Sequence, residues 1–166
     1  MSNEESNTQT KLEHLTAYLL SHLNSNLLDN KIDAWQERAT IQVDGEDRGN
    51  GGTIAAQWRY HAVVSIEDFP HQLLDPRYLF ALVACWLADY DRDRNYEELG
   101  DPEVNIDVNN HESADVAIEL EMMEPIEMIP DPNGMITWRG EKYRVQAVPI
   151  DVADDVEVSN DPDYSA

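Results

Sequence analysis

The stretch that decides the fold reads DPRYLFALVACWLADYD over residues 75–91 and VNIDVNNHESADVAIELEMM over residues 104–123. In the first segment, Asp75 can accept a backbone N–H bond, and Pro76 suits a first helical position that needs no donor. Apolar side chains then recur at helical spacing on one face, at Leu79, Leu82, Val83, Trp86 and Tyr90. The segment therefore predicts an amphipathic helix.

The second segment alternates apolar and polar residues on both sides of a polar turn at 110–113. Before the turn, Val104, Ile106 and Val108 alternate with Asn and Asp residues. After it, every second residue from Ala114 to Met122 is apolar. Strict alternation is typical of an antiparallel hairpin with one face on the core and the other toward water. No reactive constellation lies on this scaffold.

The preceding residues repeat the same order of elements. Thr10 and Glu13 form a capping box that predicts the start of a helix, and its apolar stripe extends to the Asp29-Asn30 boundary through Leu12, Leu15, Leu19, Leu23 and Leu27. Residues 39–43 predict a first strand and residues 54–66 a longer one. A charged, Gly-rich loop is expected between them at 44–52.

These elements together predict a single α+β domain over residues 10–150. The order α-β-β-α-β-β indicates a two-layer sandwich, in which two helices cover a four-stranded, mostly antiparallel sheet. A small C-terminal hairpin is expected at 131–148, turning at Gly140-Glu141. Residues 1–9 are predicted to be a disordered N-terminus, and residues 151–166 an acidic disordered tail.

Charge is the outlying property of the composition. The 166 residues hold 34 acids and 11 bases, for a net charge of −23. Between Arg94 and Arg139 there are twelve acids and no base. Such a surface repels phosphate backbones and anionic lipids, so we expect neither direct nucleic-acid binding nor membrane association. Solubility in a salty medium, or docking onto a basic partner, would explain the excess.

The chain offers little to support catalysis or metal binding. The single cysteine, Cys85, cannot form an internal disulfide and is predicted to be a small buried hydrophobe. The five histidines lack the spacing of a zinc helix and are read as surface or interface residues. Glu119 and Glu121 point the same way from one strand, which indicates a solvated sheet face rather than acid–base machinery. We expect no enzyme activity and no cofactor.

One cluster resembles the start of a calcium loop, with oxygen ligands at Asp91, Asp93, Asn95 and Glu97. However, Tyr96 stands where that loop needs Gly, and Pro102 where it needs a bidentate Glu. Arg92 and Arg94 also interleave with the acids. A solvated helix end with local ion pairs is the better interpretation.

The four tryptophans fall one to each predicted element or junction. Trp58 and Trp86 lie on apolar faces and are predicted to be core. Trp35, at a helix–strand junction, and Trp138, on the late hairpin, are candidate contact anchors, because Trp is enriched at interface hot spots.

The runs PRYLFALVACWLADYD and NIDVNNHESADVAIELEMME resemble the tail completion protein R (GpR) family of contractile-tailed temperate phages, over residues 10–130. The resemblance implies a structural virion protein, assembled in the host cytoplasm, that finishes the tail end that joins the head. It implies a tail-terminator-like fold and a homo-oligomer, with a hexameric ring as one form. Other tail proteins of the tube, sheath or neck would be its partners. The family brings no catalytic residues to this chain.

The candidate interface residues are then Trp35 and Trp138, together with the acidic outer face of the 104–123 hairpin at Asp107, Glu119 and Glu121. Two other classes of function stay open at this point. An acidic DNA mimic would bind a basic nucleic-acid-binding partner through its carboxylates. A calcium-binding accessory module would use the Asp91 cluster.

Overall fold

The structure is a computed structural model that describes residues 9–23, 31–47 and 51–146. The predicted disordered ends, residues 1–9 and 151–166, lie outside the described residues except for Gln9. Leu27 of the first apolar stripe also lies outside them.

The described chain is an α+β fold, as predicted, and its first six elements follow the expected order. Two helices and six strands make it up: α2 (Lys11–His22), β1 (Ile32–Asp47), β2 (Thr53–Phe69), α4 (Pro76–Tyr90), β3 (Glu103–Val108), β4 (Ala114–Pro130), β5 (Ile136–Trp138) and β6 (Glu141–Gln146).

The sheet differs from the prediction, because all six strands belong to one antiparallel sheet. The strands follow the order β1-β2-β4-β6-β5, and β3 pairs with β4 off this path. The predicted C-terminal hairpin is present as β5 and β6, but it joins the sheet through β4, so the predicted count of four strands is wrong. The physical reason is the length of β4, which pairs with β3 over Ala114–Glu119 and with β6 over Glu127–Pro130. Pro125 lies in the part of β4 between its pairing with β3 and its pairing with β6. No described strand pairs with that edge of β4 there, so the missing N–H of proline removes no hydrogen bond to a neighbouring strand on that side.

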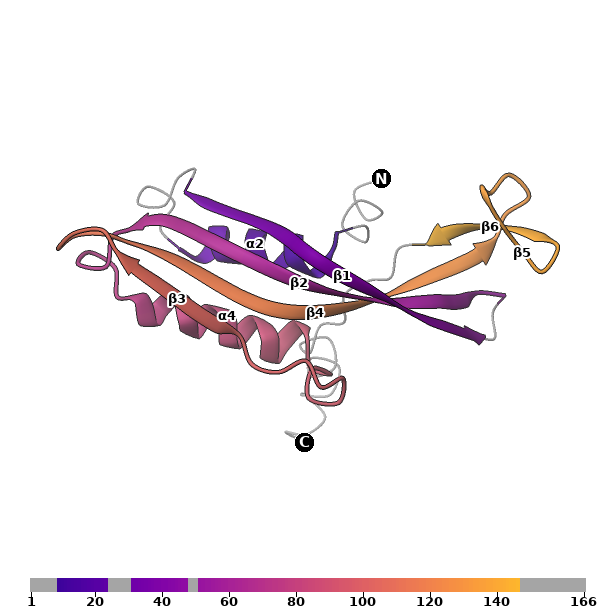
Figure 1. The fold of residues 1–166 in the computed structure, drawn as a ribbon, viewed down its shortest axis with the longest axis horizontal. Helices are drawn as coiled ribbons and strands as arrows, with labels where there is room; N and C mark the ends of the chain where they lie inside the picture. The colour runs from indigo at the N-terminus through magenta and orange to yellow at the C-terminus, as the bar shows by residue number, and fades with distance from the viewer. Residues whose placement is uncertain (1–8, 24–30, 48–50, 147–166) are drawn as a thin grey trace, which may run out of the picture.

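The long strands give the molecule an elongated shape (Figure 1). Both helices cover one face of the sheet along one half of its length, and the other half continues as a ribbon that ends in β5 and β6. Strand β1 is longer than predicted, because pairing with β2 extends it back to Ile32 and forward to Asp47. Trp35 therefore lies within a strand rather than at a helix–strand junction. The predicted loop at 44–52 is shorter for the same reason.

The core lies between the helices and the inner face of β2 and β4. The alternation predicted this face correctly on both strands, at Tyr60, Ala62, Val64, Ile66, Val116, Ile118, Leu120 and Met122. Trp86 is fully buried, as expected, while Trp58 packs against the core and is partly buried. The four leucines of the α2 stripe that are described, Leu12, Leu15, Leu19 and Leu23, are buried.

The helix ends follow local capping rules at their N-termini. Thr10 and Glu13 form the predicted capping box, and Asp75 accepts the backbone N–H of Arg77 at the start of α4. At its other end, α2 stops at His22, since Leu23 is already extended. This end falls short of the predicted boundary at residue 29.

Cys85 is exposed, which corrects the prediction that it is buried. Helix α4 turns Leu79, Val83 and Trp86 toward the core, and Cys85 lies off that stripe. Two layers bury one face of a helix and leave the other free, so an apolar helical segment keeps exposed positions.

A buried polar network joins the N-terminus of α2, the C-terminus of α4 and β4. The side chain of Asp91 is 1% exposed and accepts hydrogen bonds from Lys11 Nζ at 2.8 Å and Arg94 Nη1 at 3.0 Å. Arg94 also donates to the backbone oxygens of Glu121 at 2.7 Å and Gly100 at 2.8 Å. Arg94 thus satisfies a backbone carbonyl on the stretch of β4 that pairs with neither β3 nor β6. The predicted solvated helix end at 91–97 is wrong for Asp91, although the predicted ion pair is present.

A second set of bonds continues this network into the core. The hydroxyl of Tyr60 bonds the carboxylate of Glu124, which also accepts the backbone N–H of Lys11 at 2.9 Å. Burial raises the pKa of Glu124 above its ordinary value, against the lowering effect of the Tyr60 bond. Burial and then the nearby Glu124 charge raise the pKa of Tyr60. These bonds hold the start of α2 on the sheet.

Candidate interaction surfaces

The sheet face opposite the helices carries a histidine held between two glutamates. His61 of β2 lies beside Glu121 and Glu119 of β4, with Nδ1 2.9 Å from one carboxylate and Nε2 3.0 Å from the other. The His61 side chain is only 12% exposed. Arg59 approaches Glu121 at 3.8 Å, and the Asn105 amide donates to Glu119 at 3.1 Å. This face is therefore an ordered polar cluster.

The geometry selects the doubly protonated form of His61. A neutral imidazole offers one donor and one acceptor, whereas both of its ring nitrogens here face carboxylate oxygens, which only accept. The bond to Glu121 is the main cause that raises the pKa of His61, and the bond to Glu119 adds to it, while burial acts in the opposite sense. An imidazolium placed there links β2 to β4 across the outer face.

We expect His61→Gln to remove a pH-dependent part of the stability. The folded state holds the imidazole proton more tightly than the unfolded chain, whose His pKa is about 6.5. The contribution is therefore complete below that pH and is lost as pH rises through the folded pKa. Urea midpoints for both proteins, measured from about pH 5.5 to pH 9, should converge at the alkaline end. His111→Gln, in an exposed turn, is the matched control, and a constant gap between wild type and His61→Gln across this range would contradict the assignment.

The structure brings together two of the three predicted acidic interface residues. Glu119 and Glu121 both contact His61 and are 33% and 32% exposed, so they are less solvated than expected. Asp107 is exposed on β3, opposite Asp115 of β4. The Asp115 carboxylate accepts the backbone N–H of Asp68 and the amide of Asn109, which lower its pKa.

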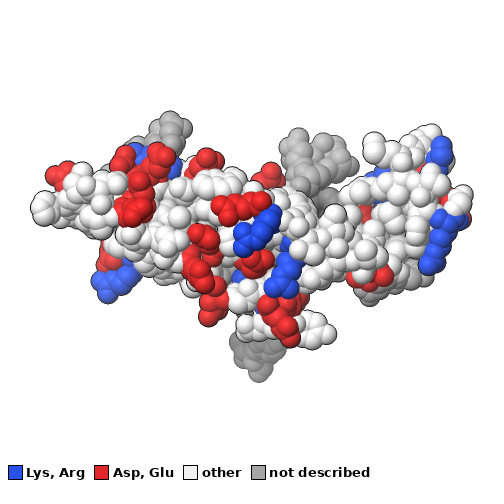
Figure 2. Space-filling model, in the orientation of Figure 1, with Lys and Arg blue, Asp and Glu red and all other residues white. Residues whose placement is uncertain are grey.

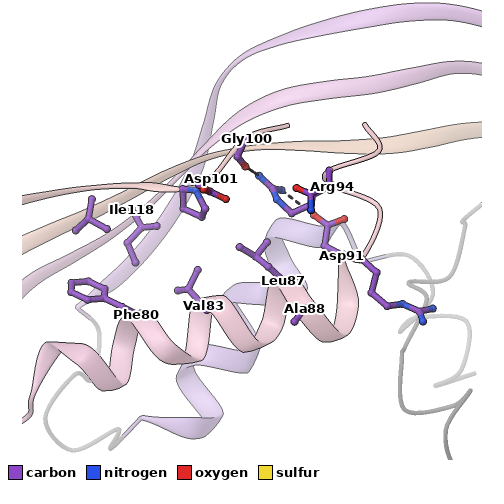
Figure 3. A pocket seen from close by; sticks show the side chains of 14 residues that line it. Phe80, Val83, Leu87, Ala88, Asp91, Arg94, Gly100, Asp101 and Ile118 are labelled. Carbon is purple, nitrogen blue, oxygen red and sulfur yellow. Dashed lines mark hydrogen bonds and ion pairs between the residues drawn. The ribbon is translucent and has the colours of Figure 1, made fainter. Parts of the chain in front are cut away.

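An apolar groove lies between α4 and the start of β3 (Figure 3). Its volume is about 620 Å³. Phe80, Val83 and Leu87 rise from α4 toward Ile118 of β4, and the Arg94 network closes one end (Figure 3). Asp101 lies on the rim. Val104 of β3 also lines the groove and is 41% exposed, and beyond it Ile106 and Val108 are 53% and 70% exposed.

Trp35 is exposed on β1, a strand at the edge of the sheet. Its cross-strand neighbour on β2 is Val63, which is buried although it belongs to the polar face of that strand. Trp35 also borders a groove of about 530 Å³ between β1 and α2. Its exposed ring lies on an edge strand rather than at a helix–strand junction, and its role as a contact residue stays a prediction.

Trp138 lies at the end of β5, where the sheet terminates. Tyr143 meets its ring edge-on at 5.7 Å, and the guanidinium of Arg139 stacks over it at 4.2 Å. The chain turns at Arg139 and Gly140, both with positive φ (52° and 82°), one residue earlier than predicted. Trp138 thus stands beside a basic turn at the tip of the ribbon.

The Asp91 cluster does not assemble as a calcium loop. The Asp91 carboxylate already binds two cationic side chains, so a cation there would displace Lys11 and Arg94. Within residues 9–23, 31–47 and 51–146, no group of three or more His, Cys, Asp or Glu side chains is placed to hold a metal ion. In the same ranges, no helix has the length and apolar character needed to cross a membrane.

Sequence reasoning missed His61, His14 and Arg94 as organising residues. His14 accepts the indole N–H of Trp86 at 2.8 Å between the two helices, and burial lowers its pKa. His61 was placed correctly on the polar face of its strand, but its glutamate partners depend on the β2–β4 register. The sequence signal for Arg94 is weak, because it consists of a basic residue among the acidic residues that follow α4.

The comparisons with known proteins identify the family of this chain. The model of the family described as P2 phage tail completion protein R (GpR) matches residues 9–147. An uncharacterized 19.2 kDa protein in the rep-hol intergenic region of Haemophilus phage HP1 (strain HP1c1) is 23% identical over 146 residues, which cover 88% of this chain and 87% of the relative. No solved structure matches the chain. Because the family match spans most of the sequence, the protein belongs to the phage tail completion protein R (GpR) family, whose role is structural, in tail assembly.

Proposed function

We propose that this protein is a tail-terminator-like completion factor that finishes the end of a contractile tail and prepares it for joining to the head. The family match over residues 9–147 is the observation that carries the proposal. The protein would act by contacts with other tail proteins of the tube, sheath or neck. We assign it no catalytic, metal or cofactor role, and we place its assembly in the host cytoplasm.

The architecture supports a role in protein contacts. One sheet face is covered by helices, and among the described residues β1, β3 and β5 each pair with a strand on one side alone, so each offers an edge to a neighbour. Trp35 and Trp138 lie on two of these edge strands. A homo-oligomeric ring, with a hexamer as one stoichiometry, needs one surface of each subunit to meet a different surface of the next.

The acidic outer face would serve either of two contacts. Asp107, Glu119 and Glu121 could meet a basic surface of the tube or neck. They could instead line a lumen, where their charge would repel passing DNA. Both roles use charge that is already organised by β3 and β4 in the folded subunit.

Interrupting the gene in the phage genome that carries it should prevent heads and tails from joining. We expect filled heads and headless tails to accumulate after induction, because the tail end that joins the head is not completed. Electron microscopy of the lysate and a plaque count would measure this, and a plasmid copy of the gene should restore infectious particles.

Native mass spectrometry of the purified chain tests the oligomer separately. A closed oligomer at micromolar concentration is the expected result. Infectious particles formed without the gene would overturn the proposal. So would a stable monomer that titrates a DNA-binding protein, since that behaviour belongs to an acidic DNA mimic.

A further inference from the structure

We propose that the β5–β6 hairpin of one subunit docks on the β3 edge of a second copy, so that the proposed ring closes through a head-to-tail contact. This inference rests on the proposed function and names the surface pair that would build its oligomer. The two surfaces are defined here. The hairpin tip comprises Met135, Trp138, Arg139, Lys142, Arg144 and Val145. The β3 ledge comprises Asp101, Glu103, Val104, Ile106, Asp107 and Val108.

The hairpin tip combines apolar and basic side chains. Met135 and Val145 are exposed large hydrophobics. Arg139 stacks on Trp138, and Lys142, which pairs with Thr137, is exposed on the other face of the hairpin. Arg144 is also exposed, with Asp131 3.4 Å away. Arg and Trp are the residue types that most often dominate binding energy at interfaces, so the tip has the composition of an anchor.

The β3 ledge combines apolar and acidic side chains. Its three β-branched residues alternate with acids and Asn, and all six residues of β3 are exposed. The ledge continues into the 620 Å³ groove against α4, whose floor is apolar and whose rim carries Asp101. An edge strand with open apolar side chains and an adjoining groove is suited to receive another polypeptide.

Charge indicates that the partner is a second copy. Subunits with a net charge of −23 repel each other, so a contact between copies must avoid setting acids against acids. Residues 101–130 hold nine acids and no base, whereas residues 131–146 hold three bases and two acids. Figure 2 shows Lys and Arg at the end of the molecule where β5 and β6 lie, and acids interspersed with some Lys and Arg over the helix-covered half. The hairpin is therefore the segment suited to the acidic ledge.

Geometry requires the contact to be intermolecular. The ledge and the hairpin lie on the same edge of β4 but at opposite ends, since β3 pairs as far as Glu119 and β6 begins at Glu127. Eight strand residues separate these points by about 26 Å. The hairpin therefore cannot reach its own ledge. Two different surfaces that meet between copies form a heterologous contact, which closes a ring when the rotation allows it.

Charge reversal on each side tests the pair. Arg139→Glu with Lys142→Glu changes the tip, and Asp101→Lys with Glu103→Lys changes the ledge. Each double variant alone should weaken association of the full chain about 100-fold, because like charges then face each other. Carrying all four substitutions in one chain should restore the oligomer to within about tenfold of wild type. Native mass spectrometry and sedimentation velocity at micromolar concentration are the measurements.

The controls separate failed folding from a failed contact. Arg77→Glu, an exposed reversal at the start of α4, should leave the oligomer intact. Circular dichroism should match wild type for every variant, and rescue by the fourfold variant shows that the doubles were folded. The inference is overturned if both double variants assemble like wild type, if the fourfold variant stays dissociated, or if wild type is a monomer. In the first two cases the tail-completion function still stands, because it is judged by the particle phenotype.

Discussion

Arg94→Met should destabilise the protein by about 3–5 kcal/mol, the cost typical of breaking a buried ion pair from one side. The substitution keeps the length of the side chain but removes three hydrogen bonds, to Asp91, Glu121 and Gly100. Of its two cationic partners within the described residues, the Asp91 side chain would keep Lys11 alone, while only 1% of that side chain is exposed. The two backbone carbonyls would each lose their charged donor, and one of them lies on the stretch of β4 that pairs with neither β3 nor β6.

Urea denaturation followed by circular dichroism would measure this loss. Arg77→Met is the matched control, because Arg77 also pairs with an aspartate, Asp75, but on the surface. The control should shift the midpoint very little, since exposed ion pairs contribute little to stability. Equal midpoints for the two variants would show that the Arg94 network does not hold the helix end to the sheet.

Trp86→Ala should cost about 3–5 kcal/mol, in the range measured for deleting large aromatic side chains from cores. Trp86 is fully buried between the helices and the sheet, and its ring neighbours are His14 and Tyr90, each with ring centroids 5.9 Å away. The substitution opens a cavity and also leaves the partly buried Nδ1 acceptor of His14 without its indole donor. Trp86→Phe keeps much of the volume and should lose less.

Cys85→Ala is the control for this helix position. Cys85 precedes Trp86 and is exposed, so its replacement should change stability by less than about 0.5 kcal/mol. Thermal and urea unfolding of the three variants against wild type are the measurements. A Trp86→Ala protein as stable as Cys85→Ala would mean that α4 does not pack on the sheet through this face.

The inner face of the sheet could be predicted from sequence because it depends on local periodicity. Side chains alternate along any strand, so the buried set of β2 and β4 follows from the pattern of apolar residues. The helix caps at Thr10 and Asp75 are local in the same sense, since each involves residues within three positions. The family resemblance rested on this periodic segment and was confirmed.

The misassigned features all depend on which segments pair. Alternation cannot show that β4 continues past Pro125 to accept β6, or that β1 extends back through Trp35 because β2 lies beside it. Cys85 has the composition of a core residue, and only the position of the sheet shows which side of α4 is covered. The Asp91 cluster looks solvated until Lys11, 80 residues earlier, approaches it.

By itself, then, the sequence determined the order and type of the main elements, their capping, the core face of each strand and the membership of the tail completion family. Only the tertiary structure decided that all six strands form one sheet. It also decided that His61 bonds glutamates about 60 residues away and that Arg94 bonds a backbone carbonyl of β4. The physical reason is the separation along the chain of the residues that interact. Periodicity and capping act within a few residues, whereas strand register and buried charge pairing join residues that only the folded chain brings together.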